Sequence, residues 1–119
     1  MNKISLLKKF ELFNEHWTPK IIGELNGQQV KIAKVKGEFV WHDHANEDEL
    51  FMVIKGRLII HLRDQTIELN EGELYIVPKG VEHKPEAPEE CWILLFEPQH
   101  IAHTGEVISD LTKVSEDWI

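Results

Sequence analysis

Hydrophobic and polar residues follow two different periods along this chain. Between residues 4 and 13, apolar side chains recur at spacings of three and four, which predicts a short amphipathic helix. From Lys20 onward, short segments rich in β-branched and aromatic residues are separated by turn signals such as Asn26-Gly27, which predicts strands. We expect these strands at residues 21–22, 30–35, 38–42, 49–54, 57–62, 66–69, 73–77 and 91–96. Eight short strands with no long helix between them predict an all-β fold, an antiparallel sandwich or barrel.

A third pattern follows Pro98. Apolar residues between Val107 and Val114 return to helical spacing and Trp118 lies further on, so we expect a short helix within residues 106–119. A chain of 119 residues is long enough for one core and too short for a second. The predicted organisation is a helical appendage over residues 1–19, a barrel domain over residues 20–104 and a helical tail over residues 105–119.

Charge and composition narrow the function classes. Lys and Arg total 13 against 21 Asp and Glu, a formal net charge of −8, which disfavours a nucleic-acid partner because phosphate binding needs clustered positive charge. No apolar run approaches the roughly 20 residues of a membrane span, and the N-terminus lacks the features of a signal peptide. We therefore expect no membrane association and a cytoplasmic location. The single cysteine, Cys91, lies in an apolar run and is interpreted as a small buried hydrophobe.

Candidate chemistry begins with two histidines one residue apart. On a strand, His42 and His44 would project from the same face with Cα atoms about 6.6 Å apart, so both imidazoles could reach one metal ion. Three adjacent acids follow, Glu47, Asp48 and Glu49. An antiparallel hairpin would fold Glu49 back beside the histidines, although composition alone does not choose among the three carboxylates.

A second segment supplies another candidate ligand. Gly72, Pro78 and Gly80 are spaced to allow a strand, a sharp turn and a return, a conformation that can aim His83 into the interior. Three neutral imidazoles and one carboxylate would make a mixed nitrogen and oxygen site. Such a site suits Fe, Mn, Ni, Co or Zn, so the sequence predicts one divalent transition metal ion whose identity stays open.

The two segments together resemble the two motifs of the cupin superfamily. The first motif, a glycine, an His-x-His pair, a glutamate and a closing glycine, is met by Gly37, His42, His44, Glu49 and Gly56. The second is met by Gly72, Pro78, Gly80 and His83. The chain resembles in particular the small single-domain bacterial cupins. Two departures are the four rather than five residues that separate Gly37 from His42, and Ala87 where the second motif ends in asparagine.

The resemblance implies a fold, a site and an assembly. The fold would be a double-stranded β-helix, or jelly-roll, cupin barrel with short terminal helices. The implied metal ligands are His42, His44, Glu49 and His83. Glu49 is chosen because it alone leaves six residues before Gly56, so Glu47 and Asp48 are interpreted as solvated loop charges. The family often pairs through an outer sheet and Ile59 is expected on the outer face, which implies a homodimer.

Three functions fit such a site. The resemblance implies first a metal-dependent oxygenase, in which a small organic substrate and dioxygen take the open metal positions. The alternatives are a sugar or hydroxy-carbonyl isomerase or epimerase, and a non-catalytic module that binds a small molecule or a carbohydrate. The expected substrate pocket is lined by Val40, Phe51, Val53, Tyr75 and Phe96.

No residue is assigned a catalytic role from the sequence. Glu38, Tyr75 and His100 are candidate helpers, since no general base is obvious. His61 is expected on the outer face of its strand, because its apolar neighbours claim the inner face. His100 or His103 could reach the barrel mouth as a proton shuttle.

Overall fold

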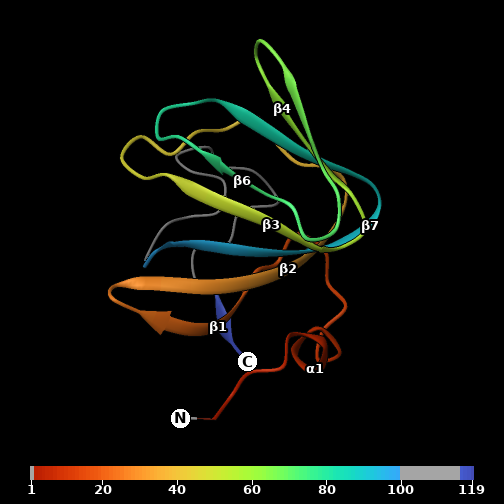
Figure 1. Ribbon diagram of the computed structural model, residues 1–119, viewed down its shortest axis with the longest axis vertical. Coiled ribbons are helices and arrows are strands. Elements are labelled where there is room, and N and C mark those ends of the chain that lie inside the picture. The colour runs from red at the N-terminus through yellow and green to blue at the C-terminus, as the bar shows by residue number, and fades with distance from the viewer. Residues whose placement is uncertain (1, 100–115) are drawn as a thin grey trace.

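Strands dominate the described part of the chain, residues 2–99 and 116–119 of a computed structural model (Figure 1). One short helix, α1 (Leu6–Phe10), precedes them and is shorter than the predicted 4–13. The strands are β1 (Lys20–Leu25), β2 (Gln28–Glu38), β3 (Glu49–Lys55), β4 (Leu58–Leu62), β5 (Thr66–Leu69), β6 (Leu74–Val77), β7 (His83–Pro98) and β8 (Asp117–Trp118). The predicted all-β fold is confirmed.

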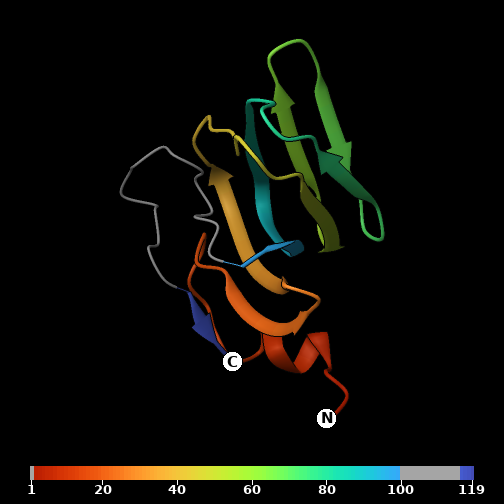
Figure 2. The ribbon, with the colours of Figure 1, turned by 90° about the vertical axis from the view of Figure 1, so that its left-hand side faces the viewer.

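Strand β7 is the centre of the sheet topology. One edge of its 16 residues pairs antiparallel with β2. Its other edge pairs with β4 near its start and with β3 near its end, so β7 joins the two halves of the barrel. The hairpin of β4 and β5 lies at one end of the molecule, and α1 and β8 lie at the other (Figures 1 and 2). The strands form the expected jelly-roll barrel.

Side chains of one parity fill the barrel. Buried and half-buried positions alternate along β3 and β4 and along β7 on either side of its exposed residues 88–90, and the inward set includes Phe51, Ile60 and Ile93. A second apolar cluster lies outside the barrel, where Phe10 of α1 stacks on Trp92 with ring centroids 4.7 Å apart. The N-terminal segment therefore covers part of the outer face of β2 and β7.

Two interpretations of single residues are confirmed. Cys91 is fully buried in the barrel core. His61 lies on the outer face of β4, where its Nε2 is 2.7 Å from Glu86 Oε1. Neither residue belongs to the candidate site.

The predicted strand at residues 38–42 does not form. β2 ends at Glu38, and an isolated bridge between His42 and His83 is the pairing that follows. Gly37 has a φ of 82° and the register between β2 and β7 shifts just before it, so the chain bends ahead of the histidines. Gly37 pairs with Ala87 and so lies within β2 rather than in the expected turn, next to an irregularity where residues 88–90 of β7 face Lys36 alone.

Strand β7 begins eight residues earlier than the predicted 91–96, at His83. Its first half contains Pro85, Pro88 and three glutamates, a composition typical of a loop. The carbonyl of Pro85 accepts a hydrogen bond from the amide of Phe39 at 2.9 Å, so a proline here still contributes to the pairing.

Most of the expected C-terminal helix falls outside the described residues, as do His100 and His103. Of its last residues, Asp117 and Trp118 form β8, which pairs parallel with Lys20 and Ile21 of β1, so this end of the chain is extended rather than helical. Within the described ranges, no helix is long and apolar enough to cross a membrane.

Candidate metal centre

Backbone hydrogen bonds hold two distant segments side by side. His42 and His83 each donate an N–H to the carbonyl of the other, with N···O distances of 3.0 and 2.9 Å. The amide of Gly80 donates to the carbonyl of His44 at 2.8 Å. Main-chain contacts therefore fix the loop after β2 against the turn between β6 and β7.

The four residues predicted as ligands converge inside the barrel. His42, His44, Glu49 and His83 each offer one donor atom, and these atoms all lie within 4.8 Å of one another. Glu49 Oε1 lies 3.3 Å from His44 Nε2 and 3.3 Å from His83 Nε2. All four residues are buried, with exposed fractions from 0% to 4%. Two come from the loop after β2, and the others are the first residues of β3 and β7.

Backbone carbonyls orient two of the three imidazole rings. His42 Nδ1 lies 2.9 Å from the oxygen of Val40, and His83 Nδ1 lies 2.9 Å from that of Val81. Because a carbonyl only accepts, each Nδ1 carries the proton, and Nε2 of the neutral ring keeps its lone pair. His42 Nε2 is buried and has no hydrogen-bond partner in the part of the chain that the structure describes.

A divalent transition metal ion fits this donor set. A buried nitrogen lone pair without a partner is unfavourable unless a cation receives it, and backbone-anchored rings are typical of metal ligands. Imidazole nitrogens together with one carboxylate suit Fe, Mn, Ni, Co or Zn. The four residues His42, His44, Glu49 and His83 are those that would hold the ion.

Burial and mutual charge adjust the protonation states of the site. Burial, and then the charge of His83, lower the pKa of His42 to about 4. Burial would raise the pKa of Glu49, but the adjacent imidazoles of His44 and His83 outweigh it, so that pKa lies well below its usual range. Burial also disfavours a charged His44, yet the adjacent Glu49 raises the pKa of His44. At neutral pH, His42 is neutral and Glu49 is ionised, the forms that bind metal.

The low pKa of His42 predicts that the metal-free protein loses stability on acidification. The unfolded imidazole takes up its proton near pH 6.5 and the folded one near pH 4. Between these values the unfolded state binds more protons, so the free energy of unfolding falls as pH decreases, by up to about 1.4 kcal/mol per pH unit. Urea unfolding of chelator-treated protein across this window measures the slope. The His42→Gln variant should lack the contribution of His42 to this slope. Equal slopes in the wild type and the variant would contradict the low pKa of His42.

Of the three adjacent acids, Glu49 is the one in the cluster. Asp48 is an exposed loop residue, as expected, and its Oδ1 also accepts a hydrogen bond from the amide of Lys79 at 2.9 Å. Glu47 is half-buried, and its charge helps to raise the pKa of His44. Asp48 therefore joins the loop after β2 to the turn after β6.

A buried ion cluster that sequence reasoning missed adjoins the site. Lys31 is 1% exposed, its Nζ lies 2.9 Å from Glu97 Oε1, and it also contacts Glu116. Continuing the register between β3 and β7 places Glu97 opposite Glu49. Burial, and then the charge of Glu49, raise the pKa of Glu97 well above its usual range. The charges of the site are thus coupled to a lysine on β2.

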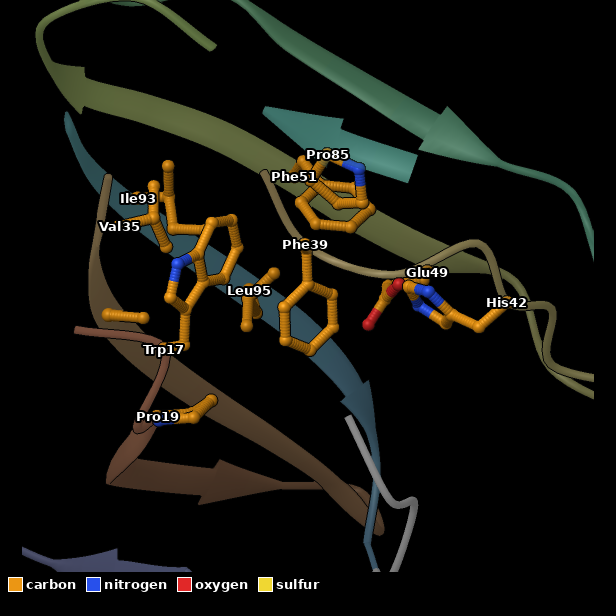
Figure 3. Close-up of a pocket in the computed structure, with 11 residues that line it drawn as sticks. Trp17, Pro19, Val35, Phe39, His42, Glu49, Phe51, Pro85, Ile93 and Leu95 are labelled. Atoms are coloured by element: carbon orange, nitrogen blue, oxygen red, sulfur yellow. The ribbon is translucent and has the colours of Figure 1, made fainter. Parts of the chain in front are cut away.

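An apolar cavity opens beside His42 and Glu49 (Figure 3). About 340 Å³ of empty space lies among its lining residues, a volume that includes open solvent at its mouth. Figure 3 shows His42 and Glu49 at one end and Trp17, Val35 and Ile93 at the other. The lining residues are Trp17, Pro19, Ala33, Val35, Phe39, His42, Glu49, Phe51, Pro85, Ile93 and Leu95. Apart from the two prospective ligands, every lining side chain is apolar or aromatic.

Of the five residues predicted to line a pocket, Phe51 does so. Val53 is fully buried in the core, and Tyr75 packs against that core. Val40 is half-buried in the loop, where its carbonyl orients His42. Phe96 lies on the outward face of β7. The cavity is therefore not lined by Val40, Val53, Tyr75 or Phe96.

Four lining residues come from segments that sequence reasoning left out of the pocket. Trp17 and Pro19 belong to the stretch assigned to the N-terminal appendage, and Phe39 and Pro85 flank the ligand-bearing segments. Trp17 and Pro19 follow the predicted helix at residues 4–13, and their local sequence pattern does not mark them as part of a pocket. The candidate helper Glu38 is exposed and lies 3.3 Å from Lys84 Nζ, away from the cavity.

A model of the cupin domain family matches residues 29–97, a range that holds all four clustered residues. The chain belongs to the cupin family. A cupin-2 domain containing protein from Shewanella frigidimarina, known from a crystal structure, is 56% identical with a TM-score of 0.80, over 81% of this chain and 94% of that one. A Neisseria meningitidis protein of known structure is 29% identical with a TM-score of 0.76, over 82% of this chain and 100% of that one.

The curated proteins include one further relative of this cupin. It is the uncharacterised YdbB of Bacillus subtilis, 39% identical over 64 residues, which are 53% of this chain and 57% of the relative. The cupin thus spans little more than half the length of YdbB. The family match and these relatives identify a small bacterial cupin, and the structure adds a candidate metal-binding cluster.

Proposed function

We propose that this cupin is a metal-dependent oxygenase acting on a small, largely apolar organic substrate. The observation that carries the proposal is the position of His42 and Glu49, two of the four prospective ligands, at the polar end of an otherwise apolar cavity. Four ligands leave two positions open on a six-coordinate ion. A bound transition metal supplies the redox chemistry that these side chains lack.

The chain's own residues would bind the substrate and exclude water. Phe39, Phe51 and Leu95 line the cavity between its two ends, so an apolar substrate would lose its hydration shell there. The carbonyls of Val40 and Val81 hold two imidazole rings in fixed orientations. Substrate and ligands would therefore meet in a preorganised site.

The cavity gives less support to a sugar isomerase. Sugar hydroxyls buried without partners are unfavourable, and the lining offers polar partners only at His42 and Glu49. Nor do the buried lysines suit a phosphate clamp, because Lys31 contacts Glu97 and Lys34 Nζ donates to the carbonyl of Phe13 at 2.8 Å. A non-catalytic module for apolar ligands would need no buried set of metal donors.

Elemental analysis followed by oxygen uptake tests the proposal. Protein purified without added metal should contain a redox-active transition metal, and it should consume dioxygen when supplied with small apolar compounds that carry a metal-binding oxygen group. Zinc content without oxygen uptake would contradict the oxygenase and favour the isomerase. Protein that holds no metal, even after exposure to each candidate ion, would favour the binding module.

We also propose that the cupin forms a homodimer through the outer face of β6 and β3. Leu74 and Ile76 of β6 are each 50% exposed. Their cross-strand partners on β3 are Met52 and Leu50, so the four side chains make one apolar patch on a sheet face. A second copy of the chain is the occupant proposed, because a two-fold contact buries such a patch against itself. The cytoplasmic location stays a prediction.

The double variant Leu74→Lys with Ile76→Lys is expected to be a monomer, because four lysines would face one another across a two-fold contact. Light scattering measures the mass of the wild type and the variant. Leu12→Lys is the matched control, since Leu12 is 65% exposed and lies outside the patch. A monomeric wild type, or a double variant of unchanged dimeric mass, would contradict the proposed interface.

A further inference from the structure

Trp17 has a backbone conformation that the fold alone does not explain. Its φ is 58°, in the left-handed region that bulky residues rarely adopt. The other non-glycine residue with positive φ in the described ranges is Asn26, which belongs to the tight Asn26-Gly27 turn. Unfavourable conformations of this kind persist where the surroundings hold them, and they are frequent at functional sites.

Three contacts hold Trp17 in place. Its amide donates to the carbonyl of Lys34 at 2.9 Å, and its indole Nε1 donates to the carbonyl of Lys36 at 2.9 Å. Its ring stacks on Phe39, with centroids 4.6 Å apart and an interplanar angle of 17°. The indole N–H is thus already used, and the ring presents carbon atoms to the cavity.

The position of Trp17 makes it an end wall. It lies at the opposite end of the cavity from His42 and Glu49 (Figure 3). A ligand held at those two residues would extend along Phe39 and Phe51 toward the indole. The distance from the prospective metal to this ring therefore limits the length of the ligand.

We propose that the ligand is a compound with a single-ring-sized apolar body and one metal-binding oxygen group, and that Trp17 is the specificity-determining residue that excludes longer bodies. The inference rests on the proposed metal site and names its substrate class. The polar end of the cavity supplies the partners for the oxygen group, and the apolar lining supplies none for further hydroxyls. The N-terminal segment is then part of the binding site as well as a cover for the barrel.

Ligand binding to zinc-loaded protein tests this inference without turnover, since zinc is redox-inactive. The probes are catechol, the naphthalene analogue with the same pair of adjacent hydroxyls, and ribose. Calorimetry should show that the wild type prefers catechol to the two-ring analogue by about tenfold or more and does not bind ribose. Trp17→Gly should abolish or reverse that preference, because glycine keeps the left-handed backbone while it removes the wall.

Trp118→Gly is the matched control, because Trp118 is 55% exposed on β8 and does not line the cavity. Its preference should equal that of the wild type. Should Trp17→Gly fail to fold, Trp17→Phe should shift the preference in the same direction by a smaller factor. A wild type that binds ribose or both aromatic probes equally, or Trp17 variants with unchanged preference, would overturn the inference. Zinc that is not retained would overturn the proposed site itself, so the two failures are distinguishable.

Discussion

Replacing Glu49 with alanine is expected to lower the affinity for divalent transition metals by about 100-fold or more. Glu49 carries the negative charge of the ligand set, and its Oε1 lies 3.3 Å from both His44 Nε2 and His83 Nε2. Without it, three neutral imidazoles would surround a buried dication whose charge no ligand balances, which is unfavourable. Metal content per chain after chelator treatment, reloading and dialysis measures the loss.

Glu47→Ala is the matched control for this prediction. Glu47 lies two residues away and is half-buried, but it is not among the clustered donors. This variant should keep its metal. Metal lost from Glu47→Ala and kept by Glu49→Ala would contradict the choice of carboxylate, and thermal unfolding followed by circular dichroism checks that both variants are folded.

The clustered residues were predictable because local chain geometry brings them together. Gly56 has a φ of 93°, and a Cβ there would lie 3.0 Å from the carbonyl oxygen of Glu90, so only glycine fits this turn. Gly80 has a φ of 76° in the turn that returns the chain to His83. Each of these backbone conformations requires glycine at a fixed position relative to the ligands, and such a spacing can be recognised from the sequence alone.

The secondary structure around the histidines was less predictable, because distant pairing decides it. Residues 38–42 are rich in aromatic and β-branched residues, as strands are, yet the chain leaves β2 after Glu38, just past the register shift at Gly37. His42 and His44 are nevertheless both buried while the residue between them is half-buried, so the predicted alternation survives without a strand. Hydrogen bonds between His42 and His83 replace the ladder.

The cavity wall and the buried lysine lay beyond sequence reasoning for a related reason. Residues 31–35 of β2 are all buried, since the N-terminal segment covers the face that would otherwise meet solvent. An alternation of apolar and polar residues cannot reveal the inner face of such a strand. The sequence pattern therefore does not show that Lys31 points inward or that Trp17 reaches the barrel.

Replacing Lys31 with methionine is expected to destabilise the fold by about 3–5 kcal/mol at neutral pH, because it leaves the buried Glu97 and Glu116 without their cation. Lys31 and Glu97 are each 1% exposed and lie 2.9 Å apart. The loss should shrink as the pH falls, since burial, and then the charge of Glu49, already raise the pKa of Glu97 and favour its neutral form. Urea unfolding of metal-free protein measures the change.

Two further variants separate the buried ion pair from other causes. Arg57→Met removes a surface pair with Glu68, whose side chains are 45% and 52% exposed, and should cost less than about 1 kcal/mol. Adding Glu97→Leu and Glu116→Leu to Lys31→Met replaces all three members of the buried cluster with apolar groups and should recover much of the loss. If this triple variant is as unstable as Lys31→Met, the damage comes from lost packing around Lys31. If it recovers, the unpaired carboxylates are the cause, and Lys31 serves chiefly to neutralise buried acids, one of them placed opposite Glu49.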